Sequence, residues 1–429
     1  MRRTALIVMG GVLLLAAAGC VANPVTGKSQ LDLMGESQEL ELGRSLYSPY
    51  IQQSLGPIDD PDLQAYVRRV GGSLAAVSHR PGLPYDFTAV NDPTPNAFAL
   101  PGGKICVTRG LLSRFESEDG MAAVIGHEIG HVTARHAVSA YNRQILAGLI
   151  VLGAGVYASS SDDDAAPLVG LGAMIGSQMV LAKYSRDDER QSDELGLEYG
   201  VKAGFSPRGM IETHKVLLSL QQKAPGMVDR MFASHPMSAE RLATAEKRVA
   251  EMPPDIRDRP LKSEPYRRTA GQVIADRPAW DLVVEGQTLL AGKKPKEGEA
   301  KLAEAARRAP SAGVIRTLHA IGLYRAKQGE AAIAEAREGA RLAGGVFVPR
   351  LVAGELLVKP APAEALTNLD AAEKILPGIA DVAFLRGRAF EALGRRQEAV
   401  GAYKEAVDRD PQGEVGAAAF GRLRALGAA

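Results

Sequence analysis

The last third of the chain repeats one pattern. Pro377 and Pro411 lie 34 residues apart, and Pro310 and Pro377 lie 67 residues apart, which leaves room for one further copy between them. Small and apolar residues recur at matching offsets in four blocks: Gly286, Leu289, Leu302, Ala305; Ala320, Leu323, Ala332, Ala336; Ala353, Leu356, Ala365, Leu369, Ala372; Gly387, Phe390, Ala399, Tyr403, Ala406. Such a period indicates pairs of helices, each of which buries its apolar face by stacking on the next pair.

The order of these residues (small, apolar, apolar, alanine, proline) is that of a tetratricopeptide unit. Residues 279–429 are therefore expected to form an all-α superhelix of four units, with a capping helix over 415–426. The charged, proline-rich stretch 251–278 is interpreted as a linker. On that interpretation the repeats fold separately from residues 21–250.

Length and charge set the remaining limits. A chain of 429 residues is too long for one ordinary domain. Hydrophobic residues at 46% and charged residues at 24% are the proportions of a soluble globular protein. The 51 basic residues almost balance the 50 acidic ones, and nucleic-acid binding requires a basic excess on one face. No nucleic-acid partner is expected.

The first twenty residues have the pattern of a secretory signal peptide. Arg2 and Arg3 precede an apolar run over 5–18, which is too short to span a bilayer. The run ends in Ala17-Ala18-Gly19-Cys20, which is similar to the lipobox of bacterial lipoproteins, although leucine is usual at position 17. Ordinary cleavage after Ala18 is the alternative and would leave Cys20 a free thiol.

Lipidation of Cys20 would anchor the chain to a membrane. Val21 follows the cysteine where an aspartate would signal retention, and in enteric-type sorting this implies the outer membrane. The expected location is the periplasmic side of the outer membrane, or the soluble periplasm if Cys20 is not lipidated.

Between the signal and the repeats, the pattern predicts an α+β domain. Apolar residues at helical spacing follow Asp60-Pro61, and short β-prone runs over 85–91, 97–100 and 104–108 suggest a small antiparallel sheet. A long helix is expected over 117–138. Two apolar, glycine-rich stretches, 144–157 and 166–182, are too short to span a membrane. They predict either a helical hairpin over the domain or a hairpin that enters the membrane or gates the site.

The long helix carries His127-Glu128-Ile129-Gly130-His131, an HExxH motif. Residues four apart lie on one face of a helix, so both imidazoles can reach one zinc ion. Zinc lowers the pKa of its bound water to about 7, and Glu128 is then placed to act as general base. The competing interpretation is that His127 and His131 are structural histidines buried in the core and bind no metal.

Zinc needs a third protein ligand. One zinc-peptidase pattern supplies this ligand as a histidine six residues after the second histidine of the motif. This chain has no histidine six residues after His131, and His136 is one position short of that place. The remaining candidates are acidic residues on a later helix. Glu189 with Asp193 one turn on gives a ligand and a carboxylate able to orient a histidine. Asp187 and Asp188 are rivals that lack such a partner.

The motifs together resemble the HtpX-like gluzincin peptidases, a zincin-like family that includes the CAAX prenyl proteases and the mitochondrial Oma peptidases. The resemblance rests on Asn96–Gly103, on HExxH followed by Ala134-Arg135-His136, and on Tyr184-Ser185-Arg186 before Glu189 and Asp193. BepA-type periplasmic proteases of this family also join the domain to tetratricopeptide repeats.

The resemblance implies one zinc ion per chain, with Glu189 as third ligand and Asp193 as its neighbouring carboxylate. It implies that Asn96, Ala97, Phe98, Ala99 and Leu100 form an edge strand that pairs with extended substrate, and that His235 lies near the metal as a catalytic donor to the oxyanion.

The expected function is a zinc endopeptidase of the bacterial cell envelope that degrades misfolded or unassembled proteins, with the repeats recruiting substrate or a protein partner. The alternative is a chaperone or scaffold for outer-membrane protein assembly whose peptidase site is vestigial. A membrane-embedded prenyl protease is disfavoured because the chain lacks spanning helices. BepA itself is soluble, so its assembly role transfers only weakly to a chain with a lipobox.

Overall fold

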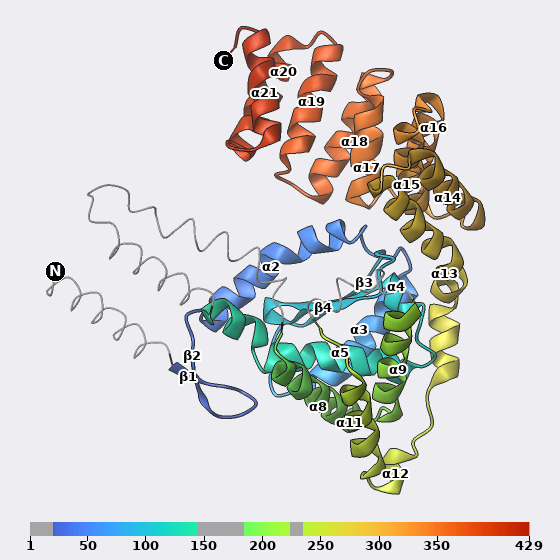
Figure 1. Cartoon of the computed structure of the whole chain (residues 1–429). Helices are drawn as coiled ribbons and strands as arrows, with labels where there is room; N and C mark the ends of the chain where they lie inside the picture. Colours follow the sequence, from blue (N-terminus) through green and yellow to red (C-terminus); the bar gives the residue numbers. More distant parts are fainter. Residues whose placement is uncertain (1–19, 144–183, 224–234, 429) are drawn as a thin grey trace, which may run out of the picture.

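The computed structural model describes residues 20–143, 184–223 and 235–428 (Figure 1). The signal segment and the expected hairpin over 144–182 lie outside these residues. A small two-stranded sheet pairs β1 (Cys20–Ala22) with β2 (Ser29–Leu31). No helix in the described ranges has the length and apolar character needed to cross a membrane.

The first unit is built around one buried helix, α5. Its helices are α2 (Glu36–Gln53), α3 (Pro61–Ala75), α4 (Arg109–Leu112), α5 (Glu118–Thr133), α8 (Arg186–Lys202), α9 (Arg208–Lys223), α11 (Ala239–Ala250) and α12 (Pro254–Arg257). Every residue of α5 is buried, and α8 and α9 pack against it. Ser117 caps its N-terminus by accepting a hydrogen bond from the Gly120 amide. The helix ends earlier than expected because Arg135 has a left-handed backbone, with φ +57°.

The expected sheet is present but is not antiparallel throughout. Its strands are β3 (Asp86–Val90), β4 (Ala97–Leu100) and β5 (Lys104–Thr108), in the order β3-β5-β4. β4 and β5 are antiparallel across the tight turn η1 (Pro101–Gly103), whereas β3 and β5 are parallel. Pro93 and Pro95 lie in the connection from β3 to β4. Proline there disfavours a tight hairpin, so β5 returns between the two strands.

Strand β4 has β5 as its only strand neighbour among the described residues. It therefore forms the edge of the sheet. Helix α2 lies beside it, with the rings of Tyr50 and Phe98 6.1 Å apart. A side chain at Gly43 of α2 would lie 1.9 Å from the Pro101 carbonyl oxygen, so only glycine allows this contact.

The second unit is the expected all-α superhelix. Its helices are the C-terminal half of α13 (Ser263–Ala291), α14 (Pro295–Arg308), α15 (Gly313–Arg325), α16 (Gly329–Leu342), α17 (Phe347–Leu357), α18 (Pro362–Ile375), α19 (Ala380–Ala392), α20 (Arg396–Arg409) and α21 (Glu414–Ala425). They stack in successive pairs with α21 at the end (Figure 1). The repeated residues Leu302, Ala365 and Tyr403 are fully buried, as the pattern requires.

The expected linker is wrong for residues 263–278, which form the first half of α13. Tyr266, Ala270 and Val273 belong to the core of the first unit, and Trp280 and Val283 further along the same helix belong to the core of the repeats. Two prolines of the expected linker are compatible with helices, because Pro254 lies in the first turn of α12 and Pro265 in the first turn of α13, where no amide donor is needed. Beyond its first turn, α13 contains only one proline, Pro278.

Candidate metal centre

Helices α5 and α8 meet along glycine faces. A Cβ at Gly130 would lie 3.0 Å from the backbone of α8, and one at Gly196 would lie 2.7 Å from the backbone nitrogen of His127. Glycine permits this separation. The close approach carries Glu189, in the first turn of α8, towards His127 and His131 of the HExxH motif.

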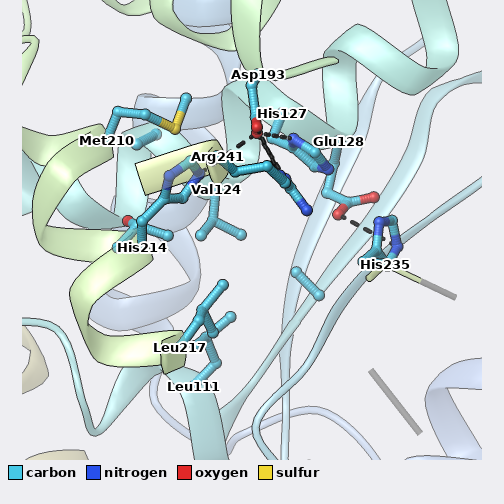
Figure 2. A pocket seen from close by; sticks show the side chains of 13 residues that line it. Leu111, Val124, His127, Glu128, Asp193, Met210, His214, Leu217, His235 and Arg241 are labelled. Atoms are coloured by element: carbon cyan, nitrogen blue, oxygen red, sulfur yellow. Dashed lines mark hydrogen bonds and ion pairs between the residues drawn. The ribbon is translucent and has the colours of Figure 1, made fainter. Parts of the chain in front are cut away.

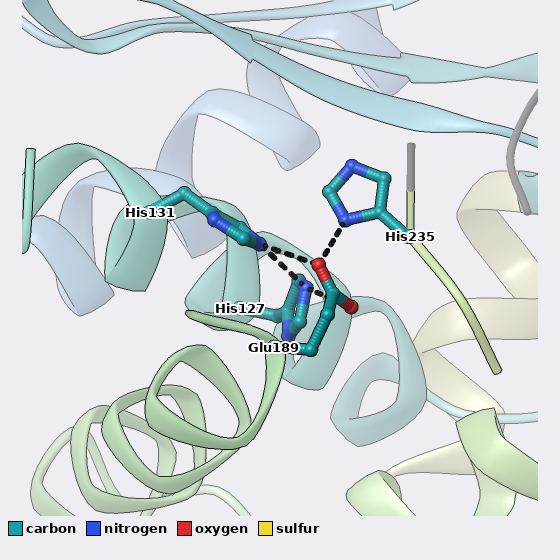
Figure 3. Close-up of side chains that lie close together, drawn as sticks. All are labelled: His127, His131, Glu189 and His235. Carbon is teal, nitrogen blue, oxygen red and sulfur yellow. Dashed lines mark hydrogen bonds and ion pairs between the residues drawn. The ribbon is translucent and has the colours of Figure 1, made fainter. Parts of the chain in front are cut away.

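Four side chains converge at this point (Figure 3). One potential ligand atom from each of His127, His131, Glu189 and His235 lies within 4.8 Å of the others. The carboxylate of Glu189 is 3.6 Å from Nε2 of His127 and 3.3 Å from Nε2 of His131. Nδ1 of His235, from the segment before α11, is 3.0 Å from the same carboxylate. The expected donor near the metal thus lies within the cluster.

The protonation of these groups fits a zinc ion. Nδ1 of His127 lies 2.9 Å from Oδ1 of Asp193, so it donates there, and Nε2, which lies 3.0 Å from Nε2 of His131, is the nitrogen that can bind a metal. Burial holds the pKa of His131 well below its usual value, so that imidazole is neutral. Burial alone would raise the pKa of Glu189, but the charge of His235 and the hydrogen bond of His131 hold it well below its usual range. Imidazole nitrogens and an ionised carboxylate are ligands that zinc accepts.

Arg241 of α11 connects the carboxylates of this cluster, and sequence reasoning missed it. Its Nη1 donates to Glu189 at 2.6 Å, while Nε and Nη2 donate to the two oxygens of Asp193, each at 2.7 Å. The guanidinium therefore holds both carboxylates in fixed orientations. No spacing in the sequence reveals this contact, because Arg241 lies on a different helix from either partner.

Glu128 lies beside the four converging side chains. It is buried, and Oε2 has no hydrogen-bond partner among the described residues. Nε2 of His235 is 3.9 Å from Oε1 of Glu128. A buried carboxylate oxygen without a partner is costly, and it is available to accept a proton from a bound molecule.

The other acidic and histidine candidates lie outside the cluster. Asp187 is 91% exposed, and Asp188 accepts a hydrogen bond from the Ser185 amide at the start of α8. His136 does not join the potential ligands, but it lies next to one of them, with Nδ1 2.9 Å from Nδ1 of His131.

The edge strand reaches the same site. Ala97 of β4 lines a pocket together with His127 and Glu128. Asn96 is buried just before the strand, and Phe98 and Ala99 are half-buried.

The fold and the site define a class: metallopeptidases in which a buried helix supplies two histidines and a second helix supplies a carboxylate. Residues 61–249 match the model of Peptidase family M48. This part of the chain is therefore similar to an M48 peptidase domain, and a stack of helix pairs follows it.

The chain is also similar to several known proteins. The chain is 30% identical over 236 residues to the beta-barrel assembly-enhancing protease of Yersinia pestis, covering 54% of this chain and 48% of that protein. It is 31% identical over 209 residues to the mitochondrial metalloendopeptidase OMA1 of Schizosaccharomyces pombe, covering 48% and 57%. The chain thus spans about half the length of the curated relatives it matches. Among solved structures, the tetratricopeptide protein YrrB matches with a TM-score of 0.32 and 15% identity, over 49% of this chain and 99% of that one.

Proposed function

We propose that this protein is a zinc-dependent endopeptidase of the bacterial cell envelope that acts on extended polypeptide. The observation that carries the proposal is the convergence of His127, His131 and Glu189 beside a buried, unpartnered Glu128. A zinc ion bound there would supply a Lewis acid for the scissile carbonyl and would acidify a water molecule. Glu189, His127 and His131 would hold this ion, with Asp193 orienting His127.

The protein's own residues would then manage the proton and the substrate. Glu128 accepts a proton from the attacking water and delivers it to the leaving amine nitrogen. His235 donates a hydrogen bond to the oxygen of the tetrahedral intermediate. The residues 96–100 pair with the substrate backbone as an added strand, which requires an extended segment and so favours unfolded or unassembled proteins.

The repeats are proposed to recruit substrates or a protein partner. Stacked helix pairs form an extended curved surface that can bind a polypeptide. Cys20 is proposed to carry lipid and to hold the protein at the periplasmic face of the outer membrane.

Removal of the metal tests the proposed activity. Wild-type protein is expected to cleave an unstructured substrate such as casein, to lose this activity with a chelator, and to regain it with added zinc. Measurement of peptide release under the three conditions is sufficient. A metal-loaded protein that suppresses aggregation of unfolded proteins but cleaves none of them would support the chaperone or scaffold instead.

The ligand assignment predicts different effects for two neighbouring acidic residues. Glu189→Ala is expected to lose bound zinc, because it removes the carboxylate from the cluster. Asp187→Ala is the matched control and is expected to keep one zinc per chain, since that side chain is exposed and ion-paired with Arg190. Metal content by plasma mass spectrometry checks both, and zinc loss in the control alone would contradict the assignment.

Lipidation of Cys20 predicts the mass of the mature N-terminus. The N-terminal peptide from membrane-bound protein is expected to begin at Cys20 and to carry a diacylglyceryl group. Cys20→Ser is expected to release the protein from the membrane. An unmodified cysteine, or a chain that begins at Gly19, would rule out the anchor.

A further inference from the structure

An apolar pocket opens beside the catalytic residues (Figure 2). It has a volume of about 40 Å³ and is lined in part by Glu128 and His127. Its apolar walls are formed by Ala97, Leu111, Ala123, Val124, Met210 and Leu217. At roughly 10–15 Å³ for each water-sized group, the pocket holds about three non-hydrogen atoms. That is the size of a small side chain.

Polar side chains also line the pocket, among them Thr213, Asp193, Arg241 and His235, and the one that matters here is His214. His214 of α9 lines the pocket and is almost fully buried, with 1% of its surface exposed. Its Nε2 lies 3.5 Å from Oδ1 of Asp193, which can only accept when ionised. Nε2 therefore carries the proton, and Nδ1 is left as an acceptor. Within the described ranges, Nδ1 has no hydrogen-bond partner.

A buried acceptor without a partner favours a ligand that brings a donor. Because Glu128 and the edge-strand residue Ala97 line the same pocket, the side chain that fills it belongs to a residue next to the cleaved bond. We propose that His214 makes the pocket select serine or threonine at this position. The hydroxyl group donates to Nδ1 of His214, and the methyl group of threonine packs against the apolar walls. This inference rests on the proposed peptidase function.

Matched peptides test the selection on the unaltered protein. Threonine and valine have the same shape but differ in the hydroxyl donor. Peptides that are identical except for this pair, placed in turn on each side of the cleaved bond, are compared by kcat/KM. At one of the two positions threonine is expected to be preferred by about tenfold, which corresponds to one net hydrogen bond. Equal rates at both positions would overturn the proposal. They would indicate that a water molecule, and not a substrate hydroxyl, donates to Nδ1 of His214.

Two variants of the pocket separate the hydrogen bond from its shape. His214→Leu removes the acceptor and is expected to remove or reverse the preference for threonine. Leu217→Met is the control, since it changes an apolar wall and is expected to keep the preference. An unchanged ratio in His214→Leu would also overturn the proposal.

Peptide binding gives a second readout. The Glu128→Gln protein is expected not to cleave, so binding can be measured on it directly. The threonine peptide is expected to have a lower dissociation constant than the valine peptide. If the wild-type protein cleaves no peptide at all, the proposed peptidase function fails. If it cleaves peptides without distinguishing threonine from valine, only the role of His214 fails.

Discussion

Glu128→Gln is expected to keep its zinc and to lose peptidase activity by a factor of about 10² to 10⁴, the range for a removed general acid–base. The substitution preserves the size of the side chain and leaves the histidine and carboxylate ligands in place. It replaces an oxygen that can accept a proton by an amide that cannot. Because Oε2 of Glu128 has no hydrogen-bond partner among the described residues, the change should break no internal contact of that atom.

The measurement combines metal content with the rate of casein cleavage. Glu194→Gln is the matched control, because Glu194 lies on α8 beside the site residues but pairs with Arg248 at the surface. It is expected to retain both zinc and activity. Wild-type activity in Glu128→Gln would show that another group takes the proton.

Tyr266→Ala is expected to reduce the free energy of unfolding by about 3–5 kcal/mol, the cost of deleting a large buried ring. Tyr266 is fully buried in the core of the first unit, and its hydroxyl donates to the Leu112 carbonyl oxygen. Its loss would leave a cavity and an unpaired carbonyl group at Leu112. Tyr324→Ala is the control, because Tyr324 is 59% exposed on the repeats, and its effect is expected to be small.

The same packing predicts the outcome of shortening the chain. A protein that ends at Ala250 lacks Tyr266, Ala270 and Val273, all three of which are buried in the first unit. It is expected to be degraded by protease under conditions in which the full chain resists. Thermal unfolding and limited proteolysis check this expectation. A stable shortened protein that still binds zinc would mean that α13 is dispensable for the first unit.

Short-range patterns predicted the parts of the molecule that depend on spacing along one helix. HExxH places its histidines on one face of α5, and Glu189 and Asp193 lie one turn apart on α8. The repeats were predictable for the same reason, since each unit contacts mainly its neighbours. The buried positions of Leu302, Ala365 and Tyr403 agree with the period.

Contacts between distant segments could not be predicted in this way. Arg241 reaches Glu189 and Asp193 from another helix, and His214 enters the pocket from α9. The parallel pairing of β3 with β5 depends on which strand lies in the middle of the sheet. The alternation of apolar and polar residues along a strand does not specify this order. The prolines of 251–278 indicated a linker because first-turn prolines and linker prolines look the same in sequence.

If the repeats capture polypeptide as proposed, the shared helix also fixes how that polypeptide is presented. A flexible tether would let the repeats sample many positions, and the effective concentration of a captured chain at the zinc site would fall with the length of the tether. Here α13 enters both cores, and the Phe347 amide of the repeats donates to the Gln52 side chain of α2 at 2.9 Å. The distance from the repeats to the catalytic cleft is therefore set by the fold. Only polypeptides whose unfolded segment begins at a suitable distance from the captured part would reach Glu128.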